Sequence, residues 1–312
     1  MRVAVRLRAA VTAQVERRRI RLTSGIEIAL LDWGGDGPPA LLHHANGFCA
    51  GLWGGVADRL RSHFRLIAMD ARGHGESSKP DPKDTANYAW TRFGEDAGAV
   101  ARQLATELRV PSLLGVGHSF GGTALMMASS ADPGLFHRLV LVDPVLPSPV
   151  FFAHVIANSA GNVENRDLAA SARKRRQVFA SRAEARDTWA GRAVFQRWDA
   201  HALDLYAEYG LLPHAGGGVE LACPGEIEAT IFDQARSFDA WELATRVPVP
   251  SLILCAERGN FGRAMYDQIA ARMRDARIAD VPTGHLVPME RPDLVAEHVL
   301  AFGGPERQRS TG

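Results

Sequence analysis

Short apolar runs that end in polar, glycine-containing loops recur along most of the chain. Such runs lie at residues 39–44, 64–70, 112–118, 136–144, 252–255 and 276–282. Between them, apolar residues return with the spacing of an amphipathic helix, as at residues 52–63, 88–108, 262–275 and 292–302. Strands that alternate with helices predict βαβ units and a mostly parallel sheet that is covered on both faces. Two earlier runs, at residues 20–25 and 27–35, predict a hairpin that turns at Ser24 and Gly25.

Residues 145–245 break this alternation. The segment shows no buried-strand pattern but holds helical stretches that carry aromatic residues, which predicts a helical insertion between two strands of the sheet. Within it, the basic run from Arg173 to Arg176 indicates a solvated helix face rather than an anion-binding site. We therefore expect an N-terminal extension at 1–19, a sheet domain at 20–144 and 246–303, an insertion at 145–245 and a tail at 304–312.

Composition and charge argue against several classes of function. The 36 basic and 35 acidic residues leave a net charge of +1, which gives no electrostatic footprint for nucleic acid or for an acidic membrane surface. Three cysteines without a C-x-x-C spacing argue against a disulfide framework or a zinc site, and they favour a reducing compartment, so we expect a cytoplasmic protein. The Arg-rich first twenty residues build no long apolar segment, which argues against a membrane span and favours a frayed or amphipathic extension over a transit peptide.

The motif Gly117-His118-Ser119-Phe120-Gly121 is the strongest chemical signal in the sequence. An apolar run precedes it and a helical pattern with small residues follows it. A serine on so sharp a strand-to-helix turn has a strained backbone, which the flanking glycines accommodate, and its Oγ is exposed at the positive end of the helix. This context favours a nucleophilic serine over an ordinary glycine-rich turn.

A serine hydroxyl acts as a nucleophile at neutral pH only with a base in hydrogen-bond reach. His285 is the candidate, because it lies between the last predicted strand and the last predicted helix, at the same carboxyl edge of the sheet as Ser119. An attacked carbonyl also needs N–H donors for the negative charge that develops on its oxygen. The amide of Phe120 is one candidate donor, and the loop at residues 43–48 is expected to supply the other.

Four segments in sequence order resemble the α/β-hydrolase superfamily. They read LLHHANGFCAGLW, DARGHGES, GHSFGG and GHLVPMERP, and the resemblance spans residues 20–303. It implies an α/β fold with a mostly parallel sheet of the eight-stranded type that helices flank, and it makes residues 145–245 a helical cap that roofs the pocket. Aligned on His44 and Trp53, the resemblance also makes Asn46 the second oxyanion residue.

The resemblance leaves the position of the acid that completes a catalytic triad open. In this superfamily the acid usually follows the strand at residues 250–256, but the usual positions hold Gly259 and Asn260. Glu257 comes slightly earlier, with a longer side chain. Some branches, such as those that resemble haloalkane dehalogenases, carry the acid at the end of the preceding strand, where this chain has Asp143. We favour Asp143, with Glu257 or a site without an acid as the alternatives.

The sequence thus predicts a cofactor-independent, metal-free serine hydrolase that forms an acyl-enzyme with a small-molecule carbonyl substrate. An ester, thioester, lactone, amide or activated C–C bond could be cleaved, most simply by a carboxylic-ester or C–C hydrolase. A cofactor-free haloperoxidase or perhydrolase on the same triad, or a non-catalytic ligand-binding member, stays as an alternative. Candidate pocket residues, for which a core role is an equal alternative, are Trp53, Phe120, Phe151, Trp189 and Met289. The oligomeric state is left open.

Overall fold

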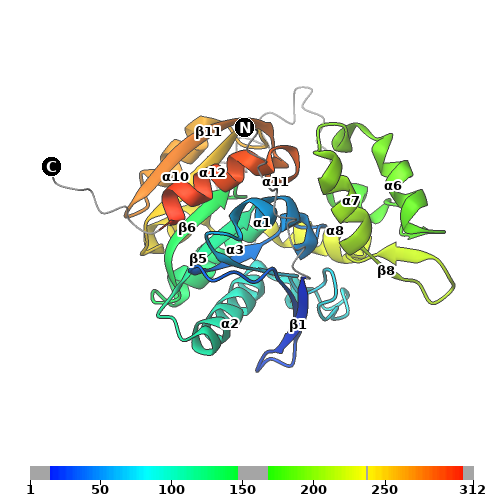
Figure 1. Cartoon of the computed structure of the whole chain (residues 1–312), viewed down its shortest axis with the longest axis horizontal. Coiled ribbons are helices and arrows are strands. Elements are labelled where there is room, and N and C mark those ends of the chain that lie inside the picture. Colours follow the sequence, from blue (N-terminus) through cyan, green and yellow to red (C-terminus); the bar gives the residue numbers. More distant parts are fainter. Residues whose placement is uncertain (1–14, 147–167, 237, 305–312) are drawn as a thin grey trace, which may run out of the picture.

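An eight-stranded sheet forms the centre of the protein, in a computed structural model that describes residues 15–146, 168–236 and 238–304. Its strands lie side by side in the order β1-β2-β4-β3-β5-β6-β10-β11 (Figure 1). They span β1 Glu16–Arg21, β2 Glu27–Asp32, β3 Pro39–His43, β4 Arg65–Met69, β5 Leu113–His118, β6 Phe136–Val142, β10 Ser251–Arg258 and β11 Ala276–Gly284. The β1–β2 and β2–β4 pairs are antiparallel and all the others are parallel, so the predicted mostly parallel sheet is confirmed.

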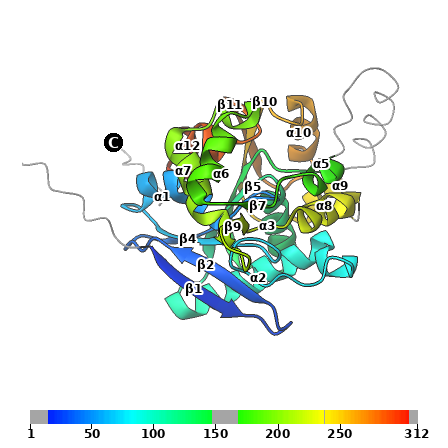
Figure 2. The same ribbon diagram turned by 90° about the vertical axis from the view of Figure 1, so that its right-hand side faces the viewer.

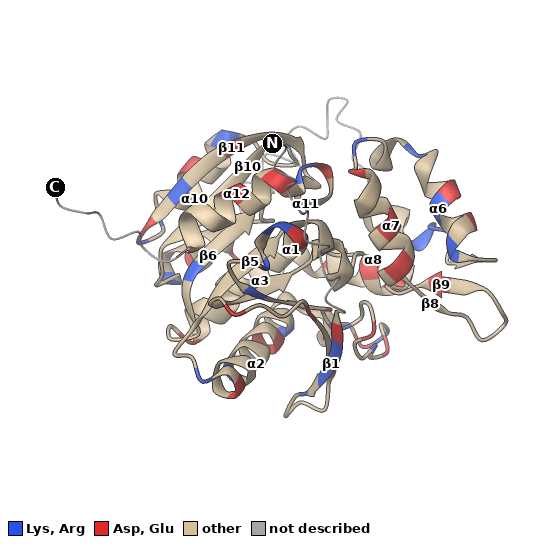
Figure 3. Ribbon diagram, viewed as in Figure 1, with Lys and Arg blue, Asp and Glu red and all other residues tan. Residues whose placement is uncertain are grey.

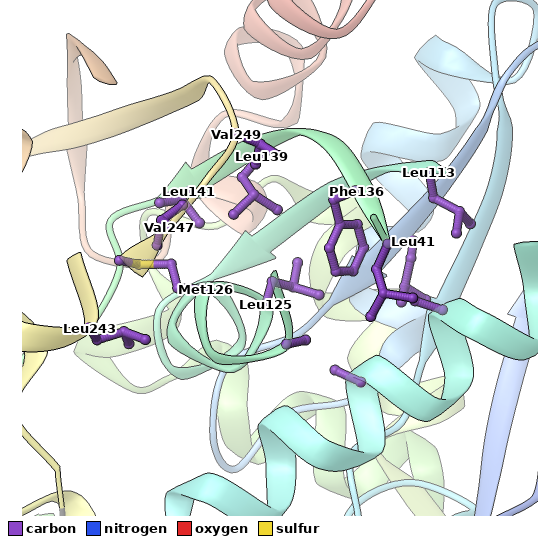
Figure 4. Close-up of a cluster of buried hydrophobic side chains, with 14 of the residues drawn as sticks. Leu41, Leu113, Leu125, Met126, Phe136, Leu139, Leu141, Leu243, Val247 and Val249 are labelled. Atoms are coloured by element: carbon purple, nitrogen blue, oxygen red, sulfur yellow. The ribbon is translucent and has the colours of Figure 1, made fainter. Parts of the chain in front are cut away.

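Helices cover both faces of the sheet. On β6, Leu139 and Leu141 join one buried cluster while Val140 and Val142 join another, because successive side chains of a strand point to opposite faces. The first cluster, part of which Figure 4 shows, is closed by α2 (Trp90–Leu108), α3 (Phe120–Ala131), α9 (Ala240–Arg246) and α10 (Arg263–Ala270). The second is closed by α1 (Gly54–Leu60) and α12 (Pro292–Gly303). Strands buried on both sides explain why the sequence shows continuous apolar runs rather than alternation.

The described part of the predicted insertion forms a second layer of elements beside the sheet (Figures 1 and 2). It holds α5 (Leu168–Arg173), α6 (Arg182–Ala190), the 3-10 turn η3 (Ala193–Phe195), α7 (Ala200–Tyr209) and α8 (Gly225–Asp233), which the 3-10 turn η4 (Gln234–Arg236) follows. A small antiparallel sheet of β7 (Val178–Phe179), β8 (Leu211–Pro213) and β9 (Val219–Leu221) joins them. The sequence pattern predicted no strand here, because two or three residues are too few for alternation to register.

These cap elements contact the loops that follow the carboxyl ends of the sheet strands. α7 packs against the 3-10 turn η1 (Ala50–Trp53), which follows β3, and against α11 (Val287–Glu290), which follows β11. α8 packs against the turn η2 (Thr85–Tyr88), which follows β4. The cap therefore lies over the edge of the sheet where a parallel fold places its active site.

α9 differs from the rest of the predicted insertion. Its residues Ala240, Leu243 and Ala244 belong to the buried cluster under the sheet, and the helix packs on α3 and α10. The domain limits at 144 and 246 stay a prediction, but this helix lies with the core.

The N-terminal hairpin and the charge distribution also follow the sequence. β1 and β2 pair in register around Gly25, whose φ of 84° suits glycine. Basic and acidic residues are both distributed over the elements in view, as on α1 and α2 (Figure 3). In the part of the chain that the structure describes, every helix is too short or too polar to cross a bilayer.

Candidate active site

Ser119 lies on a tight turn between β5 and α3. Its φ of 56° and ψ of −124° are strained for a residue with a side chain. The turn closes because glycines let the backbone approach itself: a Cβ on Gly117 would lie 2.5 Å from Cα of Gly122. A Cβ on Gly121 would lie 2.5 Å from the carbonyl oxygens of His43 and His44, so the turn also abuts the loop after β3. The glycine spacing seen in the sequence is a steric requirement of this turn.

A continuous chain of hydrogen bonds joins Ser119, His285 and Asp143. The Ser119 hydroxyl lies 2.8 Å from His285 Nε2, and His285 Nδ1 lies 2.6 Å from Asp143 Oδ2. Because a carboxylate only accepts, Nδ1 carries the proton and the lone pair of Nε2 faces the hydroxyl. Asp143 is completely buried, whereas the His285 side chain is 18% exposed. The structure thus brings together the three residues that the sequence favoured.

The Asp143 carboxylate is fixed by donors on its second oxygen. Oδ1 accepts the amide N–H of Ala256 and lies 3.1 Å from the hydroxyl of Tyr266, which is also 3.0 Å from the carbonyl of Pro144. A buried charge without such partners would be costly. The φ of Asp143, 42°, is unusual for a non-glycine residue and turns the side chain from the end of β6 toward His285. Tyr266 gave no signal in the sequence beyond its helical spacing.

The structure gives a physical reason for the glycine at position 259, where the superfamily usually carries the acid. A Cβ on Gly259 would lie 2.6 Å from Oδ2 and 2.9 Å from Oδ1 of Asp143, so the aspartate occupies the space that a side chain there would need. Glu257, the alternative acid, is exposed near the end of β10. Of these two carboxylates, the one at the imidazole is that of Asp143.

Residues 44–48, which we call the oxyanion loop, lie beside the start of α3. The Asn46 side chain is engaged, because its Nδ2 donates to the carbonyl of Glu228 at 3.0 Å. No acceptor for its main-chain amide is found among the described residues. The same holds for the amide of Phe120, since the first N–H groups of a helix have no partner within it. The Phe120 ring is buried against Trp90 and Phe93, in the core rather than in a pocket.

Four histidines close to the site are buried and neutral. Burial lowers the pKa of His43 to about 3, of His44 to about 4 and of His118 to about 3, and it lowers the pKa of His74 well below its usual range. His118 donates from Nε2 to the carbonyl oxygen of His285 at 2.8 Å, which ties the loop of the base to the end of β5. Among these imidazoles, the one within hydrogen-bond distance of the Ser119 hydroxyl is that of His285.

A small cavity lies beside His44 and His118. It measures about 10 Å³, close to the volume that holds one water, and its lining includes His118, Trp53 and Met289. Trp189 instead stacks on Tyr206 inside the cap, with 4.4 Å between the ring centroids. Phe151 lies outside the described residues. A larger cavity of about 410 Å³ lies between the β1–β2 turn and α2, and none of the three hydrogen-bonded residues lines it.

Among the described residues, no group of three or more His, Cys, Asp or Glu side chains is placed to hold a metal ion. The arrangement as it stands can relay a proton from the Ser119 hydroxyl to the His285 imidazole.

Comparison with known proteins identifies the family. Residues 40–298 match the family model described as Alpha/beta hydrolase family. The chain belongs to the alpha/beta hydrolase family. Four motifs in the sequence predicted this membership, and the match runs from β3 into α12, with the cap elements between them.

Individual relatives are more distant. The chain is similar to a 2-(acetamidomethylene)succinate hydrolase of Mesorhizobium japonicum, with 27% identity over 270 residues that cover 86% of this chain and 88% of that protein. An uncharacterized protein of Mycobacterium tuberculosis is 36% identical over 108 residues, 35% of this chain, and the match spans only 29% of that relative's length. Among solved structures, one of E-2-(acetamidomethylene)succinate hydrolase has a TM-score of 0.77 at 23% identity and covers 93% of this chain and 99% of its own. That likeness concerns the fold.

Proposed function

We propose that the protein is a serine hydrolase that cleaves small esters or amides through an acyl-enzyme on Ser119. The observation that carries this proposal is the unbroken hydrogen-bonded chain from Asp143 through His285 to Ser119. His285 Nε2 takes the Oγ proton as the oxygen attacks the substrate carbonyl, and then gives the proton to the leaving group. Asp143 holds the imidazole in the required tautomer and stabilises the imidazolium that forms.

The negative charge of the tetrahedral intermediate falls on the former carbonyl oxygen. In this proposal the amides of Phe120 and Asn46 donate to that oxygen, one from the start of α3 and one from the oxyanion loop. A water then attacks the acyl-enzyme, with His285 as the base, and releases the acid and free Ser119. Side chains and amides of the chain, with one water, account for every proton transfer.

The class of substrate rests on the named relative. The name of the Mesorhizobium relative, a 2-(acetamidomethylene)succinate hydrolase, supports a small substrate with a hydrolysable amide. The cap packs over the site, so its residues are expected to set the range of acyl groups.

The test uses a fluorophosphonate probe and p-nitrophenyl esters of two, four and eight carbons. Wild type should be labelled and should turn over the shortest ester best. Ser119→Ala should lose labelling and lower turnover by a factor on the order of 10⁶, with an unchanged melting temperature. Labelling of Ser119→Ala at the wild-type rate would refute the assignment of the nucleophile. A wild type that binds small carbonyl compounds without labelling or turnover would favour a ligand-binding protein.

A further inference from the structure

The cap holds the oxyanion loop directly, through contacts to Asn46 and Gly47. The main-chain carbonyl of Glu228, on α8, accepts the side-chain amide of Asn46 at 3.0 Å. The hydroxyl of Tyr206, on α7, donates to the carbonyl of Gly47 at 3.4 Å. A Cβ on Gly47, whose φ is 79°, would lie 2.5 Å from Oε1 of Glu228. Two cap helices therefore rest on the segment whose amide is the proposed oxyanion donor.

A single guanidinium ties these two cap helices together over the loop. Arg175, just after α5, donates from Nη1 to the Glu228 carboxylate and from Nη2 to the Tyr206 hydroxyl, the latter at 2.8 Å. A planar guanidinium can serve both partners at fixed angles, which a lysine cannot. Because the Tyr206 oxygen accepts from Arg175, its own proton is directed to the carbonyl of Gly47.

The burial of this network separates it from an ordinary surface ion pair. The side chains of Arg175 and Glu228 are 25% and 11% exposed. Two residues earlier, Arg173 also links the cap's helices, to Glu226 and Asp233, but these side chains are 40%, 56% and 52% exposed. The sequence predicted a solvated face for the whole basic run, and Arg175 departs from it.

We propose that Arg175, Glu228 and Tyr206 are positioning residues that hold the oxyanion loop so that the amide of Asn46 faces the tetrahedral intermediate. The proposal rests on the proposed function for its catalytic consequence, but the hold on the loop is a property of the fold alone. In this proposal the cap contributes to catalysis as well as to the selection of substrates.

The physical reasoning is that an oxyanion donor acts only when it is fixed before the charge develops. Loss of one such donor lowers kcat by roughly 10²–10³ in a serine protease. A loop that keeps its amide but loses the hydrogen bonds that hold it should lower kcat by part of that factor, about 10- to 100-fold. The ground-state substrate carries little charge on its carbonyl oxygen, so KM should change little.

The experiment compares Arg175→Met and Asn46→Ala with the matched control Arg173→Met. Asn46→Ala keeps the main-chain amide and removes the side-chain bond to the Glu228 carbonyl, together with the 3.2 Å contact between Asn46 Oδ1 and His74 Nε2. Three measurements are made on each: kcat and KM for a p-nitrophenyl ester, inhibition by a trifluoromethyl ketone that adds to Ser119 as a tetrahedral oxyanion, and hydrogen–deuterium exchange of the peptide at residues 44–50. Melting temperatures show whether each variant is folded, and Tyr206→Phe serves as the milder substitution if Arg175→Met is not.

The expected result is a loss of about 10- to 100-fold in kcat and in ketone affinity for Arg175→Met and Asn46→Ala, with KM within threefold of wild type. The loop peptide should exchange faster in both, and Arg173→Met should match wild type in every measurement. The double variant should lose little more than either single one, because both substitutions release the same loop. Unchanged exchange in Arg175→Met, or a loss confined to KM or to melting temperature, would overturn the proposal. A wild type without turnover would refute the proposed function, while the exchange data would still decide whether the cap holds the loop.

Discussion

Asp143→Asn is the substitution whose consequence the geometry defines most closely. Oδ1 of Asp143 accepts the amide N–H of Ala256 at 3.1 Å, and an NH₂ group in its place could not accept that bond. The new amide must therefore turn its NH₂ group toward His285 Nδ1, which lies 2.6 Å from Oδ2 in the native protein. An NH₂ group donates, so Nδ1 must give up its proton and Nε2 must carry it instead. The base then faces Ser119 with a proton rather than a lone pair.

The expected loss follows from this tautomer. A wrong imidazole tautomer costs about 10⁴ in kcat in a well-studied serine protease, which corresponds to about 5.4 kcal/mol of activation free energy. The assay is hydrolysis of a p-nitrophenyl ester, with urea unfolding to show that the variant is as stable as wild type. Glu257→Gln is the control and should stay within twofold of wild type, because Glu257 is exposed at the end of β10. A loss below tenfold for Asp143→Asn, or a larger loss for Glu257→Gln, would refute the assignment of the acid.

Three further predictions concern the surroundings of the acid and the buried histidines. Gly259→Ala should lower kcat more than tenfold, because its Cβ would lie 2.6 Å from Asp143 Oδ2. The control Gly262→Ala, where a Cβ meets nothing within 4 Å, should keep wild-type activity. Equal rates for the two variants would contradict the steric argument. Tyr266→Phe should lower the free energy of unfolding, measured in urea, by about 1.5–3 kcal/mol, the range for a hydrogen bond to a charged group. A loss of only about 0.5–1.5 kcal/mol would assign the hydroxyl proton to the Pro144 carbonyl instead. Burial lowers the pKa of His43 to about 3 in the folded protein, against about 6.5 in the unfolded chain. At pH 5 His43 is therefore protonated only in the unfolded chain, so the free energy of unfolding falls as the pH drops from 7. Between pH 7 and pH 5, the free energy of unfolding of His43→Asn should fall by about 2 kcal/mol less than that of wild type. An equal fall in the two proteins would mean that His43 is protonated in the folded protein.

The sheet domain could be predicted from local sequence because its signals are local. Apolar runs at β3, β5 and β6 are read directly, since a strand buried on both faces must be apolar throughout. The turn at Ser119 can also be predicted from the sequence, because its strained backbone needs glycines at fixed spacing. Placement of Ser119 and His285 then follows from topology: in a parallel sheet, the loops after the strands meet at one edge.

The cap was harder to predict in detail. Its strands, such as β7 at Val178–Phe179, are too short to leave a pattern. The helix α9, which belongs to the buried cluster of the sheet domain, has the same amphipathic spacing as a cap helix. The role of Arg175 was also hidden, because a charge run looks the same in sequence whether its members face water or a buried carboxylate.

By itself, the sequence determined the fold class and the strained turn that carries Ser119, because each follows from residues close together in the chain. It indicated His285 because the loops after parallel strands meet at one edge of the sheet. Only the tertiary structure shows that Asp143 rather than Glu257 lies at the imidazole, since both follow neighbouring strands and the difference is a contact of 2.6 Å between residues 142 positions apart. The same holds for Gly259, whose missing side chain makes room for that carboxylate, and for the bond from Glu228 to Asn46, 182 positions apart. Short-range periodicity records which face of an element is buried, but it carries no information about which distant polar atom completes a hydrogen bond.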